Sequence, residues 1–289
     1  MEINSRYTGT ELKPLGKTVN ARETMNYAAA INDDNPLYFD DERPEGVIAP
    51  PMYAVALTWP LIANIWNHID ADGFPKEVFF SMVHYTEHLQ FFGSVSPGDT
   101  LEIKGRIAAI LPHRAGTHIV LRLDAVKDEK LLFTEHIGGM LRGVECKGSA
   151  SGGETLPVAP EIIETVHKQE KKIFIDTLAA YVYDGCSGIH FPIHTSPKFA
   201  RSVGLPNVIY QGTATLAHAV KEIISSVADC DPSRLKAVSC RFTGMVKPLS
   251  NITVRYSVSG KNRECFFEVL NAEGARAISN GYALLTEKK

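Results

Sequence analysis

The stretch Ser187-Gly188-Ile189-His190-Phe191-Pro192-Ile193-His194-Thr195, followed by Gln211-Gly212-Thr213-Ala214-Thr215, sets the plan of this chain. A Pro-x-His turn is followed, after a short connection, by a glycine at the start of an apolar helix. The first turn of a helix has backbone N–H groups without partners inside the helix. This order therefore predicts a histidine held beside free backbone donors, and the segment is the candidate site of the chain.

The elements around this segment are predicted from spacing and turn residues. Apolar residues recur at helical spacing over 211–227, and a short helix that Asp176 can cap is expected over 176–183. Partial alternation of apolar and polar residues then predicts strands over 235–246, 252–259, 265–270 and 275–286. The second half is therefore read as helices followed by consecutive strands.

The first half repeats this order. A helix should begin after Asn20, which can cap it while Glu23 reaches back to the cap. The turn Pro36-Leu37-Tyr38 stands where the second half has Pro192-Ile193-His194. A long apolar helix is expected from Ala49-Pro50-Pro51-Met52 to about Ile69, and Pro60 should kink or divide it. Strands are expected over 78–92, 100–110, 117–126 and 131–144.

These patterns predict an α+β fold with antiparallel sheets, built by internal duplication. The two matching turns and the repeated element order favour duplication over two unrelated α+β halves that look alike by chance. The Gly- and Ser-rich run 148–154 has the composition of a linker. The predicted organisation is an N-terminal module at 1–147, a linker at 148–164 and a C-terminal module at 165–289.

Composition excludes several classes of function. The chain has 289 residues and a formal net charge of −3, so no global field favours nucleic acid or a membrane surface as a partner. Its five cysteines are scattered without a Cys-x-x-Cys pair, which predicts a reducing, cytoplasmic environment and neither a disulfide scaffold nor a metal site. We also expect no secretory leader and no membrane span.

The candidate segment resembles the MaoC-type dehydratases, or (R)-specific enoyl-CoA hydratases, in their double hot-dog form. Their signature is Ser-Gly-Asp-x-Asn-Pro-Leu-His-x-Asp, followed by His-Gly at the start of a central helix. The resemblance covers nearly the whole chain, and it is divided between the halves. Asp33 and Asn35 keep the acidic and amide positions, whereas Tyr38 replaces the histidine. The second half keeps His194 and has Ile189 where the acid belongs.

The resemblance implies roles for the residues of the second half. His194 would act as the catalytic base, and the Gly212 N–H would stabilise negative charge on a thioester oxygen. Asp184 is the local replacement for the missing acid. Gln211, Thr213 and His190 would contact the substrate or a water, although His190 also suits simple packing in the loop. Because Pro50 and Pro51 lack N–H groups and Tyr38 is no base, the first-half site is expected to be degenerate.

The resemblance further implies a hydro-lyase that interconverts 3-hydroxyacyl-CoA and 2-enoyl-CoA. The alternatives are a non-catalytic acyl-CoA-binding subunit and an acyl-CoA thioesterase, since hot-dog folds support both. No cofactor is expected beyond the coenzyme A or acyl-carrier thioester itself. An exposed sheet edge makes a homodimer the expected assembly.

Overall fold

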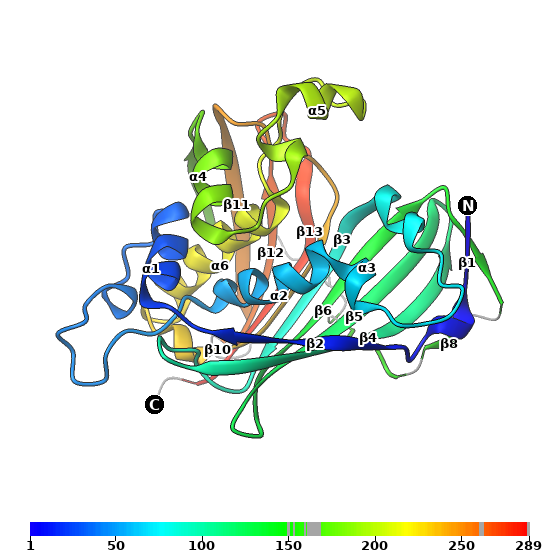
Figure 1. The fold of residues 1–289 in the computed structure, drawn as a ribbon. Coiled ribbons are helices and arrows are strands. Elements are labelled where there is room, and N and C mark those ends of the chain that lie inside the picture. Colours follow the sequence, from blue (N-terminus) through cyan, green and yellow to red (C-terminus); the bar gives the residue numbers. More distant parts are fainter. Residues whose placement is uncertain (149–150, 153, 159, 161–168, 260–262, 288–289) are drawn as a thin grey trace.

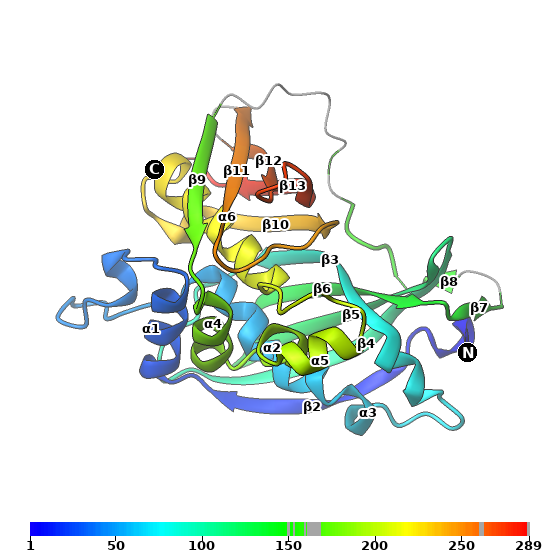
Figure 2. The same cartoon turned by 90° about the horizontal axis from the view of Figure 1, so that it is seen from above.

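The computed structural model describes residues 1–148, 151–152, 154–158, 160, 169–259 and 263–287. One long sheet forms the framework, with strand order β2-β4-β5-β6-β3-β10-β13-β12-β11-β9. Helices α2 and α6 lie on one side of it (Figures 1 and 2). The strands of the first module are β2 (Glu11–Thr18), β3 (Met82–Phe91), β4 (Thr100–His113), β5 (Gly116–Lys127) and β6 (Lys130–Arg142). Those of the second are β9 (Gln169–Ile175), β10 (Leu235–Phe242), β11 (Ser250–Ser259), β12 (Glu264–Leu270) and β13 (Arg276–Leu285).

Short strands complete the first module: β1 (Glu2–Asn4) pairs in parallel with β7 (Glu145–Lys147), and β8 (Ser151–Gly152) pairs with β4. β8 lies inside the predicted linker. The predicted module boundaries at 147 and 165 stay a prediction, because residue 165 falls outside the described residues. No helix in the described residues is long and apolar enough to cross a membrane.

Helix α6 (Gly212–Val227) confirms the predicted apolar helix of the second half. Leu216, Ala219, Val220 and Ile223 are fully or almost fully buried, as their helical spacing predicts. Gln211 is the N-cap residue. The helix is packed against the sheet over its length, and its N-terminus therefore has a fixed position.

The first-half counterpart of α6 is divided differently from the prediction. It consists of a 3-10 turn, η3 (Pro51–Tyr53), then α2 (Ala54–Ala63) and α3 (Ile65–His68). The break comes at Asn64 and not at Pro60. The side chain of Asn64 donates to the carbonyl of Pro60 at 3.0 Å, which satisfies a carbonyl near the end of the helix.

Two helix predictions near the N-termini need correction. Asn20 caps α1 (Ala21–Ala30), as predicted, but the carboxylate of Glu23 accepts from Lys17 and from Tyr53 and does not return to the cap. The helix expected over 176–183 is α4 (Ala179–Ser187), because Asp176 caps a preceding turn by accepting from Leu178 N–H.

The strand expected over 78–92 is also shorter than predicted. Residues before 82 form the 3-10 segment η4 (Lys76–Ser81), and β3 starts only at Met82. The apolar residues Val78 and Phe79 are buried in either conformation, so their composition alone did not separate the two structures.

The two modules join through β3 and β10, which pair antiparallel at the centre of the sheet. His88 pairs with Ser239, with Glu87 opposite Cys240 and Leu89 opposite Val238. Val95 and Val246 accept matching hydrogen bonds from Ala49 and Tyr210, so residue 95 corresponds to 246 and Glu87 to Val238. A pseudo-twofold axis therefore passes near the first pair. Near the same axis α1 packs on α4, and the hydroxyls of Tyr27 and Tyr183 lie 3.1 Å apart.

Repeated hydrogen bonds fix the correspondence between the modules. Ile48 N–H donates to the Leu37 carbonyl, and Ile209 N–H donates to the Ile193 carbonyl. Likewise Ala49 N–H donates to Val95 and Tyr210 N–H to Val246, both at 2.8 Å. Tyr38 is therefore the counterpart of His194, and Pro51 is the counterpart of Gly212.

Candidate functional site

His194 ends the 3-10 turn η5 (Pro192–His194), immediately before the connection to α6. Its Nδ1 lies 2.8 Å from the carbonyl oxygen of Ile209. A carbonyl only accepts, so Nδ1 carries the hydrogen and the Nε2 lone pair is left free. Burial lowers the pKa of the imidazole, while the hydrogen bond to Ile209 acts in the opposite direction. The ring is therefore a neutral base at physiological pH.

Gly212 is the first residue of α6, where backbone N–H groups lack partners inside the helix. The ring of Phe242 packs against it. A Cβ at position 212 would lie 3.1 Å from the nearest carbon of this ring, closer than ordinary van der Waals contact. Glycine therefore allows Phe242 to pack closely on the backbone at the start of α6, and a larger residue would displace the ring.

Gln211 and Thr213 flank Gly212, and both are buried. The Gln211 amide donates to the carbonyl of Ala180 at 2.9 Å, while its Oε1 accepts from no described residue. Thr213 Oγ1 accepts from the hydroxyl of Tyr183 at 3.2 Å. These contacts tie the start of α6 to helix α4. The predicted roles of Gln211 and Thr213 in substrate binding stay a prediction.

Asp184 and His190 lie together at the other end of the site loop. Burial raises the pKa of the Asp184 carboxyl, whereas His190 and the backbone N–H of Phe191 favour its ionised form. Its Oδ2 is buried without a hydrogen-bond partner among the described residues. His190 is exposed, with its Nδ1 3.0 Å from the Gly188 carbonyl. The catalytic role predicted for Asp184 stays a prediction.

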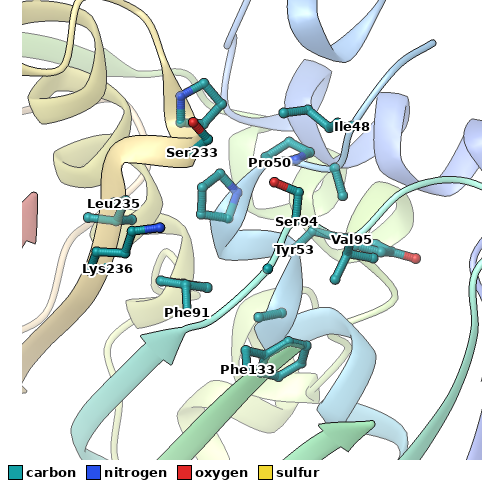
Figure 3. Close-up of a pocket in the computed structure, with 15 residues that line it drawn as sticks. Ile48, Pro50, Tyr53, Phe91, Ser94, Val95, Phe133, Ser233, Leu235 and Lys236 are labelled. Carbon is teal, nitrogen blue, oxygen red and sulfur yellow. The ribbon is translucent and has the colours of Figure 1, made fainter. Parts of the chain in front are cut away.

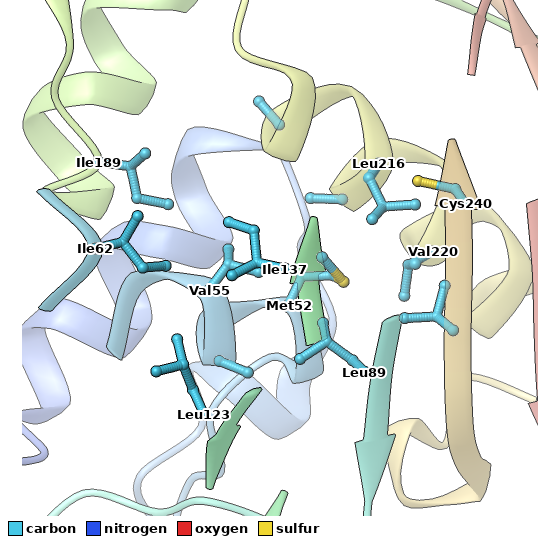
Figure 4. Packing of buried hydrophobic residues seen from close by; sticks show 14 of the residues in the cluster. Met52, Val55, Ile62, Leu89, Leu123, Ile137, Ile189, Leu216, Val220 and Cys240 are labelled. Carbon is cyan, nitrogen blue, oxygen red and sulfur yellow. The ribbon is translucent and has the colours of Figure 1, made fainter. Parts of the chain in front are cut away.

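Ile189, which stands where the related signature has its acid, points into the core. It is 4% exposed, and Figure 4 shows it facing Ile62 of α2. A carboxylate at this point would be surrounded by apolar side chains. The substitution therefore removes an acid from the loop and adds an apolar contact between the modules.

The corresponding site of the first module has lost its chemical groups. Tyr38 is fully buried, and burial raises the pKa of its phenol well above the ordinary value. Pro51 has no N–H to donate. A small cavity of about 90 Å³ lies beside Pro51 between the two modules, and Figure 3 shows the side chains around it. It is lined by Ile48, Pro50, Pro51, Phe91, Leu235 and Lys236, among others.

One group near α6 was not assigned from the sequence. His84 comes from β3 of the first module, and its ring lies 4.4 Å, centroid to centroid, from the ring of Phe242. Its Nε2 is 3.1 Å from Glu87 Oε2. A second buried acid, Glu135 of β6, lies beside Glu87. The three-residue spacing of His84 and Glu87 was the available signal, but nothing in the sequence places β3 beside a helix over a hundred residues later.

Comparison with known proteins gives matches for both halves. Residues 158–279 match the MaoC-like domain, and residues 6–130 match the dehydratase domain region of FAS1-like proteins. The probable enoyl-CoA hydratase 2 of Dictyostelium discoideum is 21% identical over 284 residues, which cover 95% of this chain and 94% of that protein.

Solved structures support the fold. A MaoC-like dehydratase from Phytophthora capsici superposes with a TM-score of 0.85 at 19% identity, covering 98% of each chain. A Mycobacterium tuberculosis protein described as having a double hotdog fold gives a TM-score of 0.57 at 11% identity, with 94% of each chain covered. The predicted α+β double hot-dog architecture is thereby confirmed.

Proposed function

We propose that the protein is an acyl-thioester hydro-lyase, on the basis of the match of residues 158–279 to the MaoC-like domain. It would interconvert 3-hydroxyacyl-CoA and 2-enoyl-CoA, as the name of its Dictyostelium relative, enoyl-CoA hydratase 2, suggests. The observation that carries the proposal is the free Nε2 of His194, in the same module as the helix-start N–H of Gly212.

Each group matches one requirement of the reaction. In the hydration direction, His194 Nε2 takes a proton from water as the water oxygen attacks C3 of the enoyl group. The Gly212 N–H, aided by the dipole of α6, donates to the thioester oxygen as negative charge develops there. C2 must then receive a proton. Asp184 is the candidate for this second acid–base role that the sequence offers, at the other end of the loop from His194.

Substrate contacts and assembly are further parts of the proposal. Gln211, Thr213 and His190 would border the acyl group or its water, and the thioester is the only small molecule required, with no resident cofactor. We also propose a homodimer and a reducing, cytoplasmic compartment. Sedimentation at micromolar concentration tests the first, where a monomer mass would contradict it, and cell fractionation tests the second.

The test of the proposed function is hydration of crotonyl-CoA or a longer 2-enoyl-CoA, followed by the loss of enoyl absorbance. His194→Ala should lower kcat at least about 10²-fold, the usual contribution of a general base. His113→Ala is the matched control, because this histidine lies at the end of β4 in the first module. An unchanged rate in His194→Ala would refute the assignment.

A specific observation favours a second candidate, an acyl-CoA-binding protein without turnover. Ile189 makes the loop beside His194 apolar where related proteins carry an acid. Calorimetric binding of acyl-CoA, with no loss of enoyl absorbance and no release of free thiol, would support this candidate. Release of thiol would instead identify a thioesterase.

A further inference from the structure

Two buried acids, Glu87 and Glu135, lie beside His84, whose side chain is 24% exposed and whose ring contacts Phe242 next to the start of α6. Glu87 and Glu135 are 1% and 0% exposed. None of their four carboxyl oxygens accepts a hydrogen bond of good geometry from a described residue. The two carboxyls lie against each other, Thr58 of α2 lies against Glu135, and Glu87 Oε2 has His84 Nε2 at 3.1 Å. Burying unpaired polar atoms is costly, so a structural purpose alone would be served better by apolar side chains.

The internal duplication shows what the fold itself requires at these positions. The strand β3 has a register irregularity between His84 and Thr86, and β10 has the same irregularity between Leu235 and Ala237. His84 therefore corresponds to Leu235. Since Glu87 corresponds to Val238, the other copy fills both positions with apolar residues. The polar pair is not demanded by the fold.

The duplication also gives the direction that His84 faces. Leu235 of the second module lines the cavity at the first-module site, together with Phe91 and Pro51 of the first module. The counterparts of these two residues are Phe242 and Gly212. Direct contacts agree, because the His84 ring lies on the Phe242 ring and Phe242 packs on Gly212. His84 and Glu87 thus lie near the helix start at Gly212, whereas Leu235 and Val238 lie near the degenerate start at Pro51.

The site lacks an acid in its loop, since Ile189 has replaced it. We propose that His84 is the second acid–base residue of the α6 site, supplied by the first module, and that Glu87 is its positioning residue. This inference rests on the hydration reaction proposed above.

The proton transfers balance as follows. His194 Nε2 takes a proton from the attacking water, and a new bond forms between the water oxygen and C3. His84 gives its Nδ1 proton to C2, while its Nε2 receives the proton of the neighbouring Glu87 carboxyl. Solvent then carries the proton of His194 back to Nδ1 of His84, and Nε2 returns its proton to Glu87. One water has then been added, and all three side chains are restored.

Burial agrees with the proton resting on the acid. It raises the pKa of Glu87 to about 8 and lowers that of His84 to about 4, and it raises the pKa of Glu135 well above its ordinary value. The other titratable groups near Glu87 are Cys240 on β10, Tyr183 on α4 and Tyr27 on α1. Burial raises the pKa of each of them, so they stay uncharged at neutral pH.

The test compares His84→Leu and Glu87→Gln with wild type in the hydration assay. His84→Leu places the side chain of the other copy in an equivalent site, which favours correct folding. We expect kcat to fall about 10²-fold with KM within about threefold. Glu87→Gln keeps the size of the side chain and removes the transferable proton. Its kcat should fall. Wild type should lose activity above about pH 8, where Glu87 gives up its proton, and Glu87→Gln should not show this decline.

Controls separate the outcomes. His88 follows Glu87 in β3 and faces the opposite side of the sheet. His88→Leu should therefore keep wild-type kcat. Asp184→Asn tests the rival acid. The inference is overturned if His84→Leu keeps wild-type kcat, or if kcat of Glu87→Gln still declines at high pH as in wild type. Either result leaves a His194-dependent hydratase intact. Absence of hydration by wild-type protein overturns both proposals. Unfolding by circular dichroism identifies a variant that fails to fold, and His84→Gln then replaces it with the same expectations.

Discussion

At the scale of single residues, Glu87 carries a cost that the fold does not require. Its pKa is raised by burial to about 8 in the folded protein, against about 4.3 for an exposed glutamate. The unfolded chain therefore releases a proton that the folded chain holds, over the pH range between these two values. Stability should fall as pH rises from about 4.5 through 8.

Glu87→Gln removes this dependence. At pH 8.5 we expect the variant to exceed wild type in free energy of unfolding by a few kcal/mol, because each pKa unit corresponds to about 1.4 kcal/mol. At pH 4 the two proteins should differ little. Urea unfolding at both pH values measures this, with Glu77→Gln as the control on an exposed position. Equal stabilities at pH 8.5 would show that the Glu87 carboxyl is not protonated in the folded state.

The sequence predicted those site residues that are close together in the chain. The turn before His194 and the cap before Gly212 are local patterns, and each can be read within a few residues. His84 could not be assigned in this way. Its neighbours are Phe242 of β10, Glu87 of β3 and Glu135 of β6, and a register irregularity in β3 directs it toward them.

At the scale of elements, α6 and α2 differ in how their first turns are built. α6 starts at a glycine, whereas the first-module helix starts through two prolines in a 3-10 turn. The apolar spacing predicted both helices. It did not predict the break at Asn64, because the apolar spacing continues across this residue. The helix ends there because the Asn64 side chain donates to the carbonyl of Pro60.

Substitution of Gly212 by alanine separates function from folding at this element. Alanine favours helix more than glycine does, so stability should be unchanged or slightly higher. The new methyl group would press on Phe242 and displace its ring beside the backbone N–H. We expect hydration to fall at least about tenfold, measured as kcat/KM.

Gly185→Ala provides the comparison for this substitution. It lies within helix α4, and a Cβ there would meet nothing within 4 Å. This variant should keep wild-type activity. If Gly212→Ala hydrates as fast as Gly185→Ala, the start of α6 does not bind the thioester.

At the scale of the whole molecule, one sheet holds two modules with unequal chemistry. The second module has the N–H donor at Gly212 and the base at His194, and His84 with its buried acids lies beside Phe242, which packs on Gly212. The first-module cavity has proline, tyrosine and leucine in the corresponding places. The architecture was predictable from repeated turns and element order, since both copies preserve them. The inequality between their interiors was visible in the sequence at positions 38 and 50–51, and at the acid position, where Asp33 stands against Ile189.

This inequality predicts the number of binding sites. A saturated acyl-CoA such as butyryl-CoA, which cannot be hydrated, should bind at about one molecule per chain. Isothermal titration calorimetry measures this ratio, and Gly212→Ala should weaken the observed site. Two equivalent sites per chain would contradict the view that the first-module cavity has lost thioester recognition.

The hydroxyls of Tyr27 and Tyr183 meet near the pseudo-twofold axis, and each residue is the counterpart of the other. A substitution of either one changes the surroundings of its own twin, whereas a change at 84 leaves 235 untouched. Substitutions away from the axis therefore affect one module only, whereas substitutions at the contact between the modules affect both. One module could therefore change its interior independently of the other, but the contact between Tyr27 and Tyr183 has kept the same residue type on both sides.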